Sequence, residues 1–388
     1  MNRTNISIMM CAAFLILGCG SPKKAVQGSS KAFFGSRLFG EVCNSNEAEN
    51  VCISPLSAQM ALSMAASGAT GETRDEIYAA MRLEGEVNAA SKEIMESING
   101  GDGNCNINIA NSIWINDKLD VKESFVNSGK EYFNALVTSA PFNQATLDRI
   151  NGWCSEETKG KIKSILGRIN ESDRMYLINA LYFKGAWEKK FSKAATGKKP
   201  FTKEDGTVAE VDMMYQNIKT SYYEDSIVQM ASKSFDGRYM MMFVLPREQH
   251  GTEEAILHLA ENYESCRYNM KVYEVELSLP KFRSEFSTSL TGPLKEMGIK
   301  RAFSGKAEFS GMSDEPLCID NVIQKTYICV DEEGAEAAAV TAISMSLTAR
   351  PDKLDKRTLN LNRPFIYMIT DITGDNILFM GKVGNPAE

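Results

Sequence analysis

The positions of hydrophobic and polar residues predict two helices near the start of this chain. Residues 55–68 begin with a proline that follows a serine, carry apolar side chains one turn apart, and end at a glycine. This pattern is typical of a buried helix. A second helix is expected from about Glu72 to Leu83, where Ile77 and Met81 lie one turn apart.

Most of the predicted strands lie in the second half of the chain. Residues 239–246 (YMMMFVLP) are continuously apolar, which favours a strand buried on both faces. Residues 272–279 alternate between apolar and polar side chains, and residues 365–383 read as two strands around a Thr-Gly-Asp-Asn turn. Strands are also expected at residues 107–117 and 176–184. Because helices and strands do not alternate regularly, the fold class is predicted to be α+β.

The segment 332–347 (EEGAEAAAVTAISMSL) is ambiguous. Read as a strand, it has one face of small or apolar groups and another that carries the remaining charge and both serines. Alanine, however, favours helix over strand. We therefore expect a segment with more than one available conformation, whose function depends on which it adopts. The first face holds Ala335, Ala337, Ala339, Thr341, Ile343 and Met345.

Composition and net charge restrict the classes of function that are expected for this protein. The 388 residues are 43% hydrophobic and 24% charged, as in a soluble globular protein. The formal charge of −7 and the lack of a basic stripe exclude nucleic acid as an expected partner.

The N-terminus is predicted to be a targeting segment. An apolar run from Ile6 to Leu17 precedes Cys19, and LILGC resembles the signal of bacterial lipoproteins, in which the cysteine receives the lipid. An ordinary cleaved signal or a coincidental cysteine are the alternatives. We expect a signal peptide at 1–18, a tether at 19–31 and one domain at 32–388. Cys19 would then anchor an exported protein to a membrane of the bacterial cell envelope.

Cysteines and histidines give no sign of a metal or catalytic site. No CxxC occurs, and the seven cysteines after Cys19 are an odd number at wide spacing, so most are expected to be unpaired and buried. His250 and His258 have no further His or Cys at ligand spacing. We therefore expect no metal, no cofactor and no enzymatic activity.

Six strings, in order, resemble the serpin family from about Ala32 to Pro386. They are ISPLSAQMALSMAASGATGETRDEI, LINALYFKGAWEKKF, LPKF, EMGIKRAFS with AEFSGMS, VDEEGAEAAAVTA, and NRPFIYMI with ILFMGKVGNP. The resemblance implies a serpin fold with three β-sheets, about eight or nine helices, and an exposed reactive-centre loop at about 332–358.

The resemblance implies that the protein is a suicide-substrate inhibitor of serine endopeptidases. It also implies that the inhibitor is a monomer. A target protease cuts the loop and forms an acyl-enzyme, and the loop then inserts into the central sheet with the protease attached. Fourteen residues from Ala335 to Thr348 would form a strand on the order of 45 Å long. The implied hinge has no charge on its inward face, which fits an inhibitory member. It comprises Glu332, Glu333, Gly334, Ala335, Glu336, Ala337, Ala338 and Ala339.

Two further sites follow from the resemblance. A sheet-opening region is expected to contain Ser54, Ser57, Asn179, Trp187 and Gln324, with Gln324 where the family often has histidine. The reactive bond is expected at Thr348-Ala349, or at Leu347-Thr348 if the count shifts by one.

A threonine or leucine before the bond suits an elastase-like or chymotrypsin-like protease, whereas Arg350 is followed by Pro351, which resists cleavage. Inhibition of papain-like cysteine proteases and a non-inhibitory binding or chaperone role remain alternatives.

Overall fold

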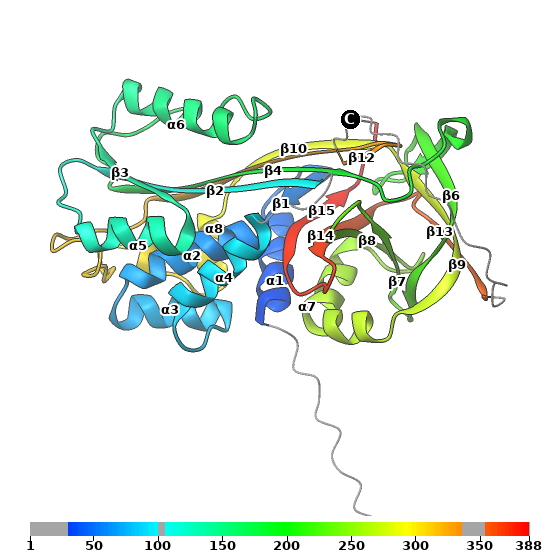
Figure 1. Ribbon diagram of the computed structural model, residues 1–388, viewed down its shortest axis with the longest axis horizontal. Coiled ribbons are helices and arrows are strands. Elements are labelled where there is room, and N and C mark those ends of the chain that lie inside the picture. Colours follow the sequence, from blue (N-terminus) through cyan, green and yellow to red (C-terminus); the bar gives the residue numbers. More distant parts are fainter. Residues whose placement is uncertain (1–29, 100–104, 336–353, 388) are drawn as a thin grey trace, which may run out of the picture.

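A computed structural model describes residues 30–99, 105–335 and 354–387 of the chain (Figure 1). Within these ranges the chain forms eight α-helices and two short 3-10 helices. They are α1 (Ser30–Asn44), α2 (Pro55–Gly68), α3 (Gly71–Met81), α4 (Val87–Asn99), α5 (Glu123–Phe133), α6 (Gln144–Glu157), α7 (Thr252–Tyr268), α8 (Thr291–Glu296), η1 (Lys193–Ala195) and η2 (Arg301–Phe303).

The strands of the described residues form two sheets. In the first, six strands follow the order β10 (Phe282–Ser289), β11 (Asn321–Val330), β12 (Gly334–Ala335), β4 (Met175–Ala186), β2 (Cys105–Asn116) and β3 (Leu136–Ala140). In the second, nine strands follow the order β1 (Asn50–Ile53), β15 (Ile377–Val383), β14 (Phe365–Asp371), β8 (Tyr239–Pro246), β7 (Val228–Ser234), β6 (Val208–Glu224), β9 (Lys271–Pro280) and β13 (Lys356–Asn360), with β5 (Gly197–Thr202) on β6.

The nine-stranded sheet unites two of the three sheets that the family resemblance implies. The reason is the length of β6, whose 17 residues pair with β5 at one end, β9 in the middle and β7 at the other end. The α+β class is confirmed.

Helices cover both faces of the six-stranded sheet. α6 lies alone over one face, whereas α2 and α5 lie under the other (Figure 1). A large hydrophobic core lies on the side of α2 and α5 and contacts both sheets. A separate, smaller cluster lies under α6 and includes Trp114, Ile150, Cys154, Tyr176 and Ile178.

The predicted elements are confirmed with small shifts of their ends. α2 matches residues 55–68, and the Ser54 side chain caps it by accepting a hydrogen bond from the Ser57 N–H. α3 ends at Met81 rather than Leu83, because Arg82 adopts a left-handed conformation (φ 51°). All the predicted strands exist, and the C-terminal pair is antiparallel. None of the seven cysteines in the described ranges forms a disulfide, and four of them are buried.

Candidate functional site

The two central strands of the six-stranded sheet separate at one end. β4 and β11 are parallel and pair directly through seven residues each, from Asn321↔Tyr176 to Tyr327↔Tyr182. Beyond this point β12 lies between them, with Ala335 opposite Gly185 of β4 and Val330 of β11. β12 is antiparallel to both neighbours. The chain therefore leaves β12 in the direction that leads back between β4 and β11.

A tight turn brings the chain from β11 into β12. Asp331 accepts hydrogen bonds through Oδ1 from the N–H groups of Glu333 (2.8 Å) and Gly334 (3.3 Å). Gly334 has φ 153°, and a Cβ there would collide with Gly185 and come within 2.8 Å of the Cα of Ala186. Only glycine fits this close approach of two backbones.

The two glutamates of the turn form ion pairs. Glu332 is 6% exposed, and its carboxylate lies 3.0 Å from Lys281 Nζ and accepts a 3.0 Å hydrogen bond from Thr196. Burial raises the pKa of Glu332, but hydrogen bonds from its own backbone, Lys281 and Thr196 outweigh this effect and leave the pKa below its usual value. Glu333 pairs with Lys190 at 2.6 Å, which lowers its pKa as well.

Trp187 holds the backbone of the same turn. Its indole Nε1–H donates to the carbonyl of Asp331, and its N–H donates to the carbonyl of Glu333, both at 2.9 Å. The ring is stacked on Phe235, with centroids 4.3 Å apart. The predicted residue Trp187 thus belongs to the hinge end of the sheet and makes no hydrogen bond to the other predicted sheet-opening residues.

A buried lysine lies beneath this tryptophan and was not predicted. Lys233 Nζ lies 5.3 Å from the ring centre of Trp187 and 4.5 Å from that of Phe191. It donates to the carbonyl of Lys189 (2.7 Å) and to Gln216 Oε1 (2.6 Å). Burial lowers the pKa of Lys233 to about 7. Its position in β7, far from the hinge in sequence, gave no signal.

The other four predicted residues belong to one chain of hydrogen bonds. Asn179 lies in β4, Gln324 in β11, and Ser54 and Ser57 at the start of α2. Gln324 accepts from the Ser54 N–H at 2.7 Å and donates to the Ser54 carbonyl at 3.0 Å. Asn111 of β2, which the sequence analysis missed, completes the chain, because its Oδ1 accepts from Ser57 Oγ (3.2 Å) and from Asn179 Nδ2 (2.7 Å). We call Ser54, Ser57, Asn111, Asn179 and Gln324 the polar cluster.

The polar cluster spans the line along which β4 and β11 meet. Asn179 and Gln324 face each other in the register of the two strands, and both are buried. The Asn179 side chain is hydrogen-bonded to Asn111, and the Gln324 side chain is hydrogen-bonded to the backbone of Ser54. These two side chains therefore do not join β4 to β11 by a direct hydrogen bond. Two buried atoms of the cluster, Asn111 Nδ2 and Asn179 Oδ1, have no hydrogen-bond partner in the structure.

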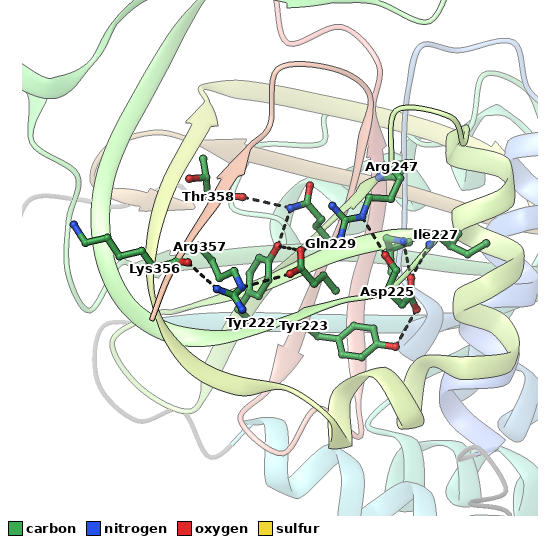
Figure 2. A network of polar contacts seen from close by, with 12 residues as sticks. Tyr222, Tyr223, Asp225, Ile227, Gln229, Arg247, Lys356, Arg357 and Thr358 are labelled. Carbon is green, nitrogen blue, oxygen red and sulfur yellow. Dashed lines mark hydrogen bonds and ion pairs between the residues drawn. The ribbon is translucent and has the colours of Figure 1, made fainter. Parts of the chain in front are cut away.

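The far end of the loop is anchored in the nine-stranded sheet. β13 pairs in parallel with β9, so the loop limit expected near residue 358 lies inside this strand. Arg357, labelled in Figure 2, pairs with Glu224 at 3.4 Å. It also lies 4.4 Å from the ring centre of Tyr273. Gln229 donates to the carbonyl of Thr358 (3.4 Å) and to the Tyr222 hydroxyl (2.7 Å).

The remaining predicted site residues lie outside the described ranges. They are Cys19, Glu336, Ala337, Ala338, Ala339, Leu347, Thr348 and Ala349.

Comparisons with known proteins agree with this geometry. The family model "Serpin (serine protease inhibitor)" matches residues 29–386. Iripin-1 of Ixodes ricinus is 31% identical, covering 96% of this chain and 98% of its own. The leukocyte elastase inhibitor of Bos taurus is 32% identical, covering 91% and 97%.

Among solved structures, the native state of the thermophilic serpin Tengpin is similar. It has a TM-score of 0.83 and 32% identity over 92% of this chain and 93% of its own. The chain belongs to the serpin family, which includes inhibitors that act on target proteases.

Proposed function

We propose that this serpin is a suicide-substrate inhibitor of serine endopeptidases, which traps the acyl-enzyme by inserting its cleaved loop between β4 and β11. The observation that carries the proposal is the orientation of β12, which is antiparallel to both strands at the point where they separate. A chain that continues in this direction can hydrogen-bond to both neighbours along their whole length.

Insertion is also expected to form more backbone hydrogen bonds between strands than it breaks. It breaks the seven parallel residue pairs between β4 and β11 and forms an antiparallel ladder on each side of the new strand. Parallel pairing is slightly weaker per residue than antiparallel pairing. The next residues of the inward face, Ala337 and Ala339, are small and uncharged, so they oppose entry little.

The length of the loop fits the length of the sheet. The proposed reactive bond, Thr348-Ala349, begins 13 residues after Ala335, which is about 43 Å of extended chain. β4 has 12 residues, or about 40 Å. Insertion would therefore carry an attached protease from one end of the sheet to the other. A bond at Leu347-Thr348 would shorten this path by one residue.

The proposed target is an elastase-like or chymotrypsin-like protease, because threonine or leucine before the bond suits a small to medium apolar pocket. The leukocyte elastase inhibitor among the relatives supports this choice. In this mechanism the protein supplies the bond that is cut and the folding energy that is released. The protease supplies all the catalytic groups, so the protein itself is not an enzyme.

The proposed location is the bacterial cell envelope, with a lipid on Cys19 as the anchor and a monomeric inhibitor domain beyond the tether. No helix within the described residues is long and apolar enough to cross a membrane. Replacement of Cys19 by serine is expected to release the protein from the membrane fraction. Continued membrane association of this variant would contradict the lipid anchor.

The inhibitory mechanism is tested by incubation with elastase and with chymotrypsin. We expect a protease–protein complex that survives SDS, and a cut site at Thr348-Ala349 or Leu347-Thr348. We also expect the cleaved protein to melt about 10 °C higher than the intact one, since five further inward side chains become buried. Cleavage that yields only free, clipped protein with an unchanged melting temperature would indicate a non-inhibitory serpin instead.

A further inference from the structure

Three side chains with metal-binding atoms meet where α7 contacts the turn between β6 and β7. His258 and Cys266 come from α7, and Asp225 comes from the turn. His258 Nε2 lies 2.9 Å from Asp225 Oδ2 and 3.6 Å from Cys266 Sγ. The three ligand atoms all lie within 4.8 Å of one another. No local pattern in the sequence indicates this cluster, because the histidine and the cysteine are eight residues apart and the aspartate is distant from both.

Asp225 is held in place by its own turn. Its Oδ1 accepts hydrogen bonds from the N–H groups of Ile227 (2.8 Å) and Val228 (2.9 Å). Its Oδ2 faces His258 and also accepts a 2.9 Å hydrogen bond from the Tyr223 hydroxyl (Figure 2). One carboxylate oxygen is thus fixed by the backbone, and the other is presented to the cluster.

The spacing of the atoms suits a tetrahedral zinc ion. With Zn–S near 2.3 Å and Zn–N near 2.0 Å, the sulfur and nitrogen ligands of a tetrahedral site lie about 3.5 Å apart. The observed separation of Cys266 Sγ and His258 Nε2 is 3.6 Å. By the same geometry, nitrogen and oxygen ligands lie about 3.3 Å apart, so His258 and Asp225 need to separate by only a few tenths of an ångström from their 2.9 Å contact.

Charge and exposure also fit. A thiolate and a carboxylate together balance the charge of a divalent cation. Cys266 is 1% exposed, but the side chains of His258 and Asp225 are 18% and 21% exposed, so an ion and a water molecule can reach the cluster from solvent. Burial raises the pKa of the Cys266 thiol to about 11. The thiol must therefore release its proton to solvent when the metal–sulfur bond forms.

The side-chain amide of Asn262 lies beside the other ring nitrogen of His258, with Nδ2 3.4 Å from Nδ1. Metal binding through Nε2 leaves the proton on Nδ1, which then needs an acceptor. The Asn262 amide would therefore have to turn its oxygen toward the ring to hold the metal-binding tautomer.

We propose that Asp225, His258 and Cys266 bind a Zn²⁺ ion, with water as the fourth ligand. Zinc accepts sulfur, nitrogen and oxygen ligands, and three protein ligands with water in the fourth position is an arrangement that it adopts in proteins. The ion would join α7 to the turn that directly follows Glu224, the residue that pairs with Arg357 of β13. Zinc would thereby stabilise the end of the nine-stranded sheet that anchors the reactive-centre loop.

The test is calorimetric titration of the reduced, chelator-treated protein with zinc chloride. We expect one ion per chain, and a higher melting temperature with zinc. His258→Ala and Asp225→Asn should each weaken binding at least about tenfold. His250→Ala is the matched control, because His250 is the other histidine, precedes α7 and pairs with Glu254 of that helix. Wild-type protein that binds no zinc, or a His258→Ala variant that binds as tightly as wild type, would overturn the proposal.

Cobalt provides a second measurement that reports on the sulfur. Co²⁺ in the wild-type site should show a thiolate-to-cobalt charge-transfer band. Cys266→Ala should remove this band, whereas Cys329→Ala, at another cysteine that forms no disulfide, should retain it. A band that persists in folded Cys266→Ala protein would show that the metal binds at a different cysteine, and would refute the site.

Discussion

The carboxylate of Glu332 lies 3.0 Å from the ammonium group of Lys281, at the point where the chain turns from β11 into the sheet. The glutamate side chain is 8% exposed and the lysine side chain 39%. The pair therefore joins the base of the proposed reactive-centre loop to the segment between β9 and β10. It stabilises this turn in the conformation in which Gly334 and Ala335 lie in the sheet.

Replacement of Glu332 by Gln is expected to lower the free energy of unfolding at pH 7 by about 1–2 kcal/mol, the range of a charge-assisted hydrogen bond that is partly open to solvent. Because folding lowers the pKa of Glu332 from 4.5, its contribution is fully present above that pH and is lost as the pH falls through the folded-state pKa. Urea unfolding at pH 7 and pH 3 measures both effects, and the difference between wild type and variant should shrink at pH 3.

The control is Arg283→Ala, which removes an exposed ion pair with Glu285 on β10. It should change the unfolding free energy by less than about 0.5 kcal/mol. A Glu332→Gln variant as stable as wild type at pH 7 would contradict the role of the buried pair.

Replacement of Gly334 by Ala is expected to push β12 out of the sheet, because the new Cβ collides with the backbone of Gly185 and Ala186. The cost is about 1–3 kcal/mol, as for a side chain in a strained backbone region. Hydrogen exchange at Ala335 should become faster. Gly305→Ala, at a site with open space around it, should leave exchange at Ala335 unchanged. Unaltered protection in Gly334→Ala would show that β12 tolerates a side chain there.

Replacement of Ala337 by Arg is expected to convert the inhibitor into a substrate, since an inward guanidinium must be buried without a partner as the loop enters the sheet. The protease should still cut the loop. The fraction of protease recovered in an SDS-stable complex should fall at least about tenfold, the effect of about 1.4 kcal/mol. Ala338→Arg, on the opposite face of the same segment, should retain most of the complex. Equal complex formation by both variants would refute the assignment of faces.

Replacement of Lys233 by Met is expected to change how stability depends on pH. Folding lowers the pKa of Lys233 from 10.5 to about 7 because the ammonium group is buried. Between these pH values this lysine binds more protons in the unfolded chain than in the folded one, so it contributes a rise with pH to the unfolding free energy of wild type, measured relative to the variant. The variant should lose this rise, whereas Lys189→Met, at an exposed neighbour, should keep it. Parallel curves for wild type and Lys233→Met would contradict the prediction.

Many helices and strands could be predicted from the sequence because the patterns that specify them are local. The cap and proline of α2 and the alternation of β9 are decided within a few residues, and the structure confirms them. Family motifs located the hinge turn and four of the five residues of the polar cluster. The fifth, Asn111, lies in a strand where nothing local separates a bridging asparagine from an ordinary one.

The parts that were missed depend on contacts between distant segments. Lys233 reads as an ordinary charged strand residue, yet the fold buries it beneath Trp187. Likewise, His258 and Cys266 are too far apart in sequence for ligand spacing, and Asp225 joins them only when α7 packs on the nine-stranded sheet. The family resemblance implied three sheets, whereas the described strands form two, because the 17 residues of β6 pair with β5, β9 and β7 and join them into one sheet.

The small hydrophobic cluster under α6 contains side chains from both central strands, including Tyr176 and Ile178 of β4 and Ile323 and Tyr327 of β11. In the mechanism that we propose, an incoming strand must rearrange the contacts of this helix before it can pass, and that rearrangement would contribute to the activation barrier of insertion. The acyl-enzyme would meanwhile hydrolyse at its own rate. The packing of one helix would thus help to determine a kinetic competition: how many inhibitor molecules are consumed for each protease that is captured.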